Sequence, residues 1–176
     1  MKRISCCALL LSLALSSHAQ ADDERWLREP ALSPDGAALV FTHAGDVYRV
    51  DVAGGIAVPL TVTEAVESSP RWSSDGTRIA YSSDRNGTLD VYVLDLAGGP
   101  ARRLTWHQAD DVVTGFSADG GAVLFESVRY NPPGHAADPH QRRPELYEIP
   151  VTGGTPRQIT AIEARQARLD AKGERL

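Results

Sequence analysis

The sequence predicts an all-β fold: a β-propeller with three four-stranded antiparallel blades and the start of a fourth, which together form an incomplete ring. The first observation is an Asp-Gly turn that recurs at residues 35–36, 75–76 and 119–120, at spacings of 40 and 44 residues. The second is that a tyrosine and then a Gly-Gly pair follow each turn. The three tyrosines are Tyr48, Tyr92 and Tyr147. Periods near 40 residues are typical of propeller blades, whose apolar faces need neighbouring blades to cover them.

The clearest copy is blade 2, residues 69–105. Its four apolar runs are separated by Asp-Gly, Asn-Gly and Gly-Gly, which tolerate the positive φ of tight hairpins, so we expect an up-and-down sheet. In the third run, Val91 and Val93 would lie on one face, and Tyr92 and Leu94 on the other. Because both faces are apolar, both must be covered, as in a blade sandwiched between copies of itself.

Two further copies flank this blade. Blade 1 spans residues 31–61 and has a shorter central hairpin. Blade 3 spans residues 112–160 and carries an insertion, residues 127–144, where blade 2 needs only a short turn. Four prolines in the insertion exclude a continuous helix or a central strand, so we expect a surface loop.

The amino terminus has the layout of a secretory signal peptide, residues 1–21. Lys2 and Arg3 precede an apolar run, and the segment ends in Ala19-Gln20-Ala21, after which we expect cleavage. The run is too short and too often interrupted for a membrane anchor. The mature protein would therefore be periplasmic or secreted, beginning with a charged lead segment, residues 22–30.

The carboxyl terminus predicts a blade that is cut short. Residues 167–176 match the start of a blade, with Gly173 in the place of Gly36 and Leu176 in the place of Leu39. Three blades and a fragment cannot close a ring, because known propellers have about four to eight blades. We therefore expect the chain to be the amino-terminal piece of a longer protein.

Charge and cysteine content exclude several classes of function. The formal net charge is −5, and loss of Lys2 and Arg3 with the leader would change it to −7. No basic stripe is present, so we expect no nucleic-acid partner. Cys6 and Cys7 both lie in the leader, so the mature chain would contain no disulfide. We also expect no membrane span once the leader is removed.

The serines do not predict catalysis. Gly115-Phe116-Ser117 comes nearest to a nucleophile elbow, but no G-x-S-x-G motif is present. Ser117 occupies the repeat position that Ser33 and Ser73 also hold, so a role in the turn explains it. We expect no catalytic residue in this chain, and leave its assignment as an enzyme open.

Metal and cofactor sites are also not expected. Three residues of the insertion could suggest a metal site: His135, Asp138 and His140. They lie on a proline-broken loop without the ligand spacing of a helix face. Three turn residues could suggest calcium: Asp35, Asp75 and Asp119. One carboxylate per turn is too few for a calcium cage, and such side chains stabilise the turns themselves.

One cluster of basic residues could receive a substrate carboxylate. Arg142 and Arg143 lie on the insertion, and Arg129 lies near its start. Arginine binds carboxylates through paired hydrogen bonds. The alternative is a solvated face, since most surface charges are uncommitted.

The three copies of the repeat resemble the tricorn/TolB-type propeller repeat. They read LSPDGAALVF, RWSSDGTRIAY and FSADGGAVLF, followed by D-V-Y or E-L-Y and then by Gly-Gly and Leu-Thr or Ile-Thr. Within that superfamily the chain is most similar to secreted bacterial tricorn protease homologues. Three features carry this likeness: REPALSPDG directly after the leader, the link LTWHQADDVVTGFSADG, and P-E-L-Y after the insertion.

The resemblance implies a non-catalytic amino-terminal propeller of a secreted tricorn-like serine peptidase, which gates or guides peptide substrates. The family's catalytic serine and histidine belong to distal domains, and no position here matches them. The implied partners are peptide or protein substrates and a downstream protease domain, and a homo-oligomer is left open. The alternatives are a TolB-like periplasmic interaction module and the propeller of a prolyl-oligopeptidase-like or amidohydrolase-fused enzyme.

Overall fold

The computed structural model describes residues 27–129 and 144–160, which form strands and turns without a helix. The strands make three four-stranded antiparallel sheets. Sheet 1 contains β1 (Arg28–Leu32), β2 (Ala38–His43), β3 (Asp46–Asp51) and β4 (Val58–Pro59). Sheet 2 contains β5 (Glu67–Trp72), β6 (Arg78–Ser83), β7 (Asp90–Asp95) and β8 (Arg102–Arg103). Sheet 3 contains β9 (Asp111–Phe116), β10 (Ala122–Ser127), β11 (Glu145–Pro150) and β12 (Arg157–Thr160).

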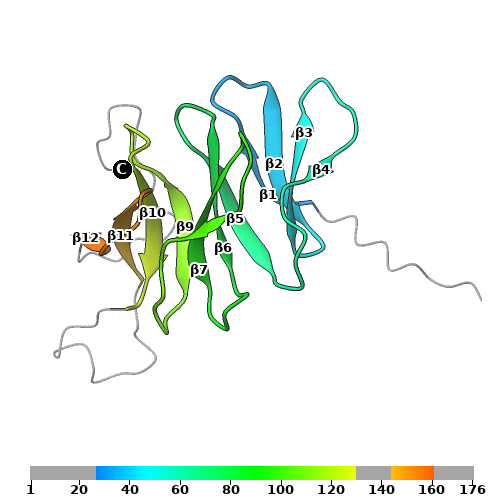
Figure 1. Ribbon diagram of the computed structural model, residues 1–176. Helices are drawn as coiled ribbons and strands as arrows, with labels where there is room; N and C mark the ends of the chain where they lie inside the picture. Colours follow the sequence, from blue (N-terminus) through cyan, green and yellow to red (C-terminus); the bar gives the residue numbers. More distant parts are fainter. Residues whose placement is uncertain (1–26, 130–143, 161–176) are drawn as a thin grey trace, which may run out of the picture.

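The three sheets stand side by side in sequence order, like part of a fan (Figure 1). Within each sheet, spatial order follows chain order, so strands that are consecutive in the sequence are neighbours. Strand β5 contacts both β1 and β9, so the first strands of neighbouring sheets lie side by side. This arrangement confirms the predicted all-β propeller, with sheets that do not close into a ring.

Two apolar cores lie between the sheets, and strand β7 contributes to both. Tyr92 packs with Val40 and Val47 in the core between sheets 1 and 2. Val91 and Val93 pack on the other side, in the core between sheets 2 and 3. Successive side chains of a strand point to opposite faces, so alternation along β7 supplies both cores. The predicted coverage of both faces is confirmed.

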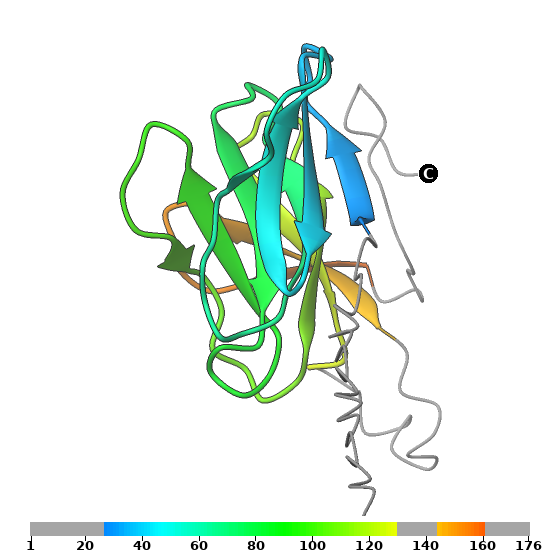
Figure 2. The ribbon, with the colours of Figure 1, turned by 90° about the vertical axis from the view of Figure 1, so that its right-hand side faces the viewer.

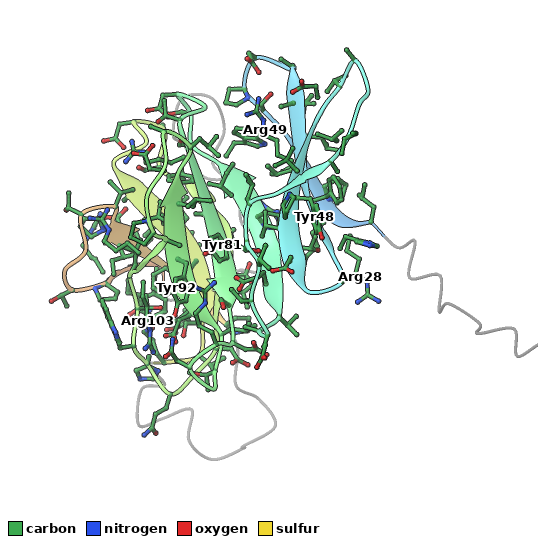
Figure 3. All side chains as sticks on the ribbon, turned by 45° about the vertical axis from the view of Figure 1, so that its right-hand side comes forward. Arg28, Tyr48, Arg49, Tyr81, Tyr92 and Arg103 are labelled. Carbon is green, nitrogen blue, oxygen red and sulfur yellow. The ribbon has the colours of Figure 1, made fainter. Side chains whose placement is uncertain are left out.

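A pair of stacked aromatic rings occupies the same place in each sheet. The ring centroids are 5.8 Å apart in Phe41–Tyr48, 5.8 Å in Tyr81–Tyr92 and 5.6 Å in Phe125–Tyr147. Tyr81 and Tyr92 lie between sheets 1 and 2, whereas Tyr48 lies on the side of sheet 1 that faces away from sheet 2 (Figure 3). Each pair therefore faces the preceding sheet, and in sheet 1 no described sheet precedes it.

The turn between the first two strands is built identically in all three sheets. In sheet 2, the hydroxyl of Ser73 donates to Asp75 Oδ1 (2.5 Å) and accepts from the backbone N–H of Arg78 (2.9 Å). Asp75 Oδ1 also accepts from the N–H of Thr77 (3.0 Å). Gly76 has a φ of 69°, a conformation that glycine adopts at low cost. The repeated serine and aspartate therefore hold the turn.

The strands begin slightly earlier than the repeat pattern predicts. β5 begins at Glu67 and β9 at Asp111, and β1 begins at Arg28, within the predicted lead segment. Charged residues at these positions resemble linker in the sequence, but Glu67 and Asp111 are buried. The predicted leader, most of the lead and insertion, and the predicted start of a fourth blade lie outside the described residues.

Candidate functional site

The first strands of the three sheets border a groove, which we call the axial groove, on the side where those strands converge. Its volume is about 390 Å³. The residues that line it are mostly apolar, and they include Pro30, Leu32, Trp72 and Phe116. Arg71 is the charged residue among the described residues of the lining. In closed propellers the blades are arranged around a central channel.

Hydrogen bonds join the first strands of neighbouring sheets beside the axial groove. The indole N–H of Trp72 donates to the carbonyl of Ala31, which links sheet 2 to sheet 1 (3.0 Å). Arg71 Nε donates to the carbonyl of Thr114, which links sheet 2 to sheet 3 (3.2 Å). Arg71 Nη1 also donates to the carbonyl of Pro70 (2.8 Å). These bonds position the indole and the guanidinium before any ligand arrives.

Two residues near the groove have a left-handed backbone. Glu29 has a φ of 50° and Ser69 a φ of 52°. Both lie where the pairing of the first strand with the second shifts register. A non-glycine residue in this conformation costs about 1–2 kcal/mol and often marks a functional site. The Glu29 carboxylate accepts from the N–H of Ser69 at 2.5 Å and from its hydroxyl at 3.3 Å. These two hydrogen bonds offset part of the free energy that the left-handed backbone costs.

A second groove, of about 660 Å³, lies between the turns of sheets 1 and 2. It shares Trp72 with the axial groove and is also lined by Asp35, Asp75 and Arg49. The hydroxyl of Ser33 lowers the pKa of Asp35, and the hydroxyl of Ser73 with the N–H of Thr77 lowers that of Asp75. Both carboxylates are therefore ionised at neutral pH, and both are already bonded to their own turns.

Buried acids at the opposite ends of the strands pair with arginines. Glu67 accepts from Arg85 Nη2 at 2.7 Å, and Asp111 accepts from Arg129 Nη2. The guanidinium of Arg85 lies 4.3 Å from the ring centroid of Tyr92. Asp90 accepts from Arg103 at 2.6 Å, and burial raises the pKa of Asp90. These groups stabilise the ends of the sheets and do not border either groove.

The structure assigns internal roles to several of the candidate residues. The hydroxyl of Ser117 donates to Asp119 at 2.6 Å and accepts from the N–H of Ala122, the same turn network as in the other sheets. Arg129 is committed to Asp111, and its side chain is 12% exposed, so it is not an open receptor for a substrate carboxylate.

Other candidates lie outside the described residues: Arg142, Arg143, His135, Asp138 and His140. Within residues 27–129 and 144–160, no three His, Cys, Asp or Glu side chains lie close enough to hold a metal ion. In the same ranges, no helix has the length and hydropathy needed to cross a membrane.

Sequence reasoning missed the residues that hold the axial groove. Glu29 lies in the predicted lead segment, and nothing in its neighbourhood signals a bond to Ser69. A signal for the buried pairs does exist. Glu67 and Arg85 are 18 residues apart, and Asp111 and Arg129 have the same separation in the next repeat. An acid and an arginine that recur at one spacing in successive repeats indicate a shared structural pair.

Comparison with known proteins gives a family match that spans most of the chain. Residues 24–176 match the family described as the tricorn protease N-terminal beta propeller domain. Dipeptidyl-peptidase 5 of Porphyromonas gingivalis is 32% identical over 71 residues, which cover 35% of this chain and 10% of that protein.

Solved structures share the fold. A TolB of Agrobacterium tumefaciens superimposes with a TM-score of 0.69 and 23% identity, covering 84% of this chain and 51% of that one. The tricorn protease superimposes with a TM-score of 0.55 and 17% identity, covering 70% of this chain and 13% of that one. The chain thus spans about half of the TolB and much smaller parts of the two peptidases.

Proposed function

Because the chain belongs to the tricorn protease N-terminal beta propeller family, we propose that it is a non-catalytic module that guides peptides toward a protease domain. The proposed guiding surface is the axial groove. A downstream serine-peptidase domain of the tricorn type would cleave what the propeller delivers. The names of two relatives, tricorn protease and dipeptidyl-peptidase 5, support a connection with peptide cleavage.

The observation that carries this proposal is the composition and rigidity of the axial groove. An apolar wall that includes Trp72 and Phe116 suits the side chains of an unfolded peptide. Arg71 is positioned by two backbone carbonyls and adds a cation to the same wall. Peptide carbonyls and carboxylates are hydrogen-bond acceptors, so a guanidinium complements them. Ordered side chains lose less entropy when a peptide binds.

The direct test measures peptide binding to the full chain. A labelled unstructured peptide with apolar side chains is titrated, and fluorescence anisotropy reports its affinity. Arg71→Gln should weaken binding by about tenfold, the scale of one charge-assisted hydrogen bond. Arg157→Gln is the matched control, because Arg157 is exposed on β12 and lies outside the groove. Equal affinities for both variants and the unaltered chain would contradict the proposal.

A second candidate function is a TolB-like protein-interaction module that binds a folded partner without delivering a substrate. The observation that favours it is the more extensive superposition on a TolB, which covers 84% of this chain. A pull-down from envelope extract distinguishes the two functions. A single stoichiometric protein partner, together with no affinity for unfolded peptides, would support the interaction module.

Export is part of the same proposal and is supported by the layout of residues 1–21. Either function then operates in the periplasm or outside the cell. Expression of the full chain in a bacterial host, followed by mass measurement of the periplasmic product, tests this. The expected mass corresponds to a chain that begins after Ala21.

A further inference from the structure

The second groove, between the turns of sheets 1 and 2, is continuous with the axial groove. Three residues line both grooves: Pro34, Trp72 and Ser74. The turns that border the second groove lie at one end of the sheets, the upper end in Figure 2. Both of these sheets belong to the described part of the chain, so the groove does not depend on blades that would follow. A peptide in the axial groove can therefore extend a side chain into the second groove.

The lining of the second groove combines an apolar wall with exposed carboxylates. Trp72 lies in the wall with Ala38 and Leu96, and the bond from its indole N–H to the carbonyl of Ala31 holds the ring in place. Three exposed aspartates also line the groove: Asp35, Asp75 and Asp95. Lysine and arginine match such a lining, because their methylene stems pack on apolar surface while their charged ends stay near water.

The aspartates give the second groove an excess of negative charge. One oxygen of each carboxylate, Oδ1, accepts a backbone N–H of its own turn, from Ala37, Thr77 and Ala97. These turn bonds leave the other oxygen of each carboxylate for a ligand. Arg49 is the one cation among the described residues of the lining. The ion pairs nearby are long, with 3.6 Å between Arg49 and Asp51 and 3.6 Å between Arg78 and Asp75.

Between sheets 2 and 3, a guanidinium of the chain itself occupies the corresponding place. Arg102 Nη2 donates to the carbonyl of Val151 and so joins sheet 2 to sheet 3. Val151 holds the repeat position of Leu96, because each donates its N–H to the carbonyl that precedes the second strand of its sheet. A guanidinium therefore lies beside the equivalent of a residue that lines the second groove.

Sheet 1 lacks this guanidinium. Val58 holds the repeat position of Arg102, since Val58 pairs with Arg49 as Arg102 pairs with Val93. Valine is short and uncharged, so it cannot reach across to sheet 2 as Arg102 reaches across to sheet 3. The place that the chain fills between sheets 2 and 3 is thus left to a ligand between sheets 1 and 2.

We infer that the second groove binds a basic side chain, lysine or arginine, of a peptide that lies in the axial groove. The inference rests on the proposed function, because it requires that peptides bind the axial groove. The stem of the side chain packs on Trp72 and Leu96, and its charged end lies among the three aspartates. A cation near the indole ring gains further electrostatic attraction. The module therefore favours peptides in which a basic residue is close to an apolar one.

Fluorescence anisotropy on the full chain tests this inference with two labelled unstructured peptides. The peptides share one apolar sequence and differ at a single position, which is arginine in one and citrulline, its uncharged isostere, in the other. The arginine peptide should bind at least about threefold more tightly at low salt, the scale of an exposed ion pair. This difference should vanish in about 1 M salt, which screens exposed charges.

Two altered chains test whether the difference arises in the second groove. Asp35→Asn combined with Asp75→Asn leaves one carboxylate and one guanidinium in the lining, while the amide oxygens still accept the turn bonds. This double variant should bind the two peptides equally. Val58→Arg supplies the groove with a cation of the chain's own, as Arg102 does between sheets 2 and 3, and should have the same effect.

Asp119→Asn is the matched control. Asp119 makes the same turn bonds in sheet 3 and lines neither groove, so this variant should keep the full difference between the peptides. Circular dichroism checks that each variant keeps its strand content. Equal affinities of the unaltered chain for the two peptides would overturn the inference and leave the proposed function intact, whereas failure of both peptides to bind would overturn both. A difference that persisted in the double variant or in Val58→Arg, or that Asp119→Asn also removed, would overturn the inference as well.

Discussion

The carboxylate of Glu29 accepts a hydrogen bond from the backbone N–H of Ser69 at 2.5 Å, and the two residues hold equivalent places in neighbouring sheets. They are 40 residues apart, one period of the repeat, and both have a φ near +50°. The side chain of the left-handed residue in sheet 1 thus accepts the backbone N–H of the equivalent left-handed residue in sheet 2. The bond fixes the spacing of β1 and β5 beside the axial groove.

Glu29→Ala should destabilise the protein by about 1–3 kcal/mol, because the buried N–H of Ser69 would lose its charged acceptor. Urea denaturation followed by circular dichroism measures the change. Glu64→Ala is the control, since Glu64 is exposed and such substitutions usually change stability by less than about 0.5 kcal/mol. Equal losses in the two variants would show that the Glu29–Ser69 bond contributes nothing measurable.

The turn aspartates should make stability depend on acid pH. Hydrogen bonds to their carboxylates, first those from Ser33, Ser73 and Ser117, lower the pKa values of the three turn aspartates. An acid with a lowered folded-state pKa contributes stability above its ordinary pKa and loses that contribution as the pH falls through the folded value. The stability of the protein should therefore fall as the pH drops below about 4, and we call this decline the acid limb.

Replacing all three turn aspartates by asparagine should flatten that limb. The amide oxygen can still accept the turn hydrogen bonds, but it does not titrate. Melting temperatures of the unaltered and triple-asparagine proteins between about pH 2 and pH 7 test this. Asp90 must be retained in both proteins, since burial raises its pKa and its contribution has the opposite sign. Parallel acid limbs in the two proteins would refute the assignment.

Removing Arg85 alone should destabilise the protein more than removing both charges of the Arg85–Glu67 ion pair. The side chain of Glu67 is fully buried, and its partner Arg85 is 27% exposed. Arg85→Met would leave a buried carboxylate without its cation, which costs about 3–5 kcal/mol. The double variant Glu67→Gln with Arg85→Met removes both charges and should lose less.

Arg157→Met provides the comparison for this ion pair, because the Arg157 side chain is 73% exposed in its pair with Glu148. An exposed pair contributes about 0–1 kcal/mol. Chemical denaturation of all three variants gives the free energies. If Arg85→Met destabilised the protein as little as Arg157→Met, the buried Glu67 carboxylate would not depend on the Arg85 cation for its stability.

The short hairpin of sheet 1 should depend on Gly45. Its φ is 90°, and a Cβ there would approach the carbonyl oxygen of Ala65 to 3.2 Å. Gly54 has a similar φ of 97°, but no atom would lie within 4 Å of its Cβ. Gly54→Ala should cost about 1–2 kcal/mol from backbone strain, and Gly45→Ala should cost more. Thermal denaturation of the two variants measures both losses of stability. The extra loss for Gly45→Ala reports the clash with the Ala65 carbonyl oxygen. Equal losses would show that this clash contributes nothing.

Much of the fold could be predicted because the residues that each turn and strand needs occur in three copies of the repeat. The turn at Asp75-Gly76 needs a side-chain acceptor and a positive φ, and both are visible as residue types. Alternation between Val91 and Tyr92 predicted two covered faces, which the two cores confirm. These are local properties of the chain, so the sequence displays them.

The candidate site could not be predicted in the same way. The axial groove forms from first strands that are about 40 residues apart, and its contacts join side chains to backbone atoms of another sheet. Backbone acceptors such as the carbonyl of Ala31 have no signature in residue type. The positive φ of Glu29 and Ser69 is equally invisible, because neither is the glycine that normally indicates it.

The central claim is that the sheets stack as blades, each with its aromatic pair against the preceding sheet. Nuclear Overhauser effects between methyl groups and aromatic rings test this most directly. The structure predicts contacts from Val40 and Val47 to the rings of Tyr81 and Tyr92, and from Val91 to the rings of Phe125 and Tyr147. Methyl contacts that placed these rings in unrelated surroundings, or against helices, would contradict the stacked-blade architecture.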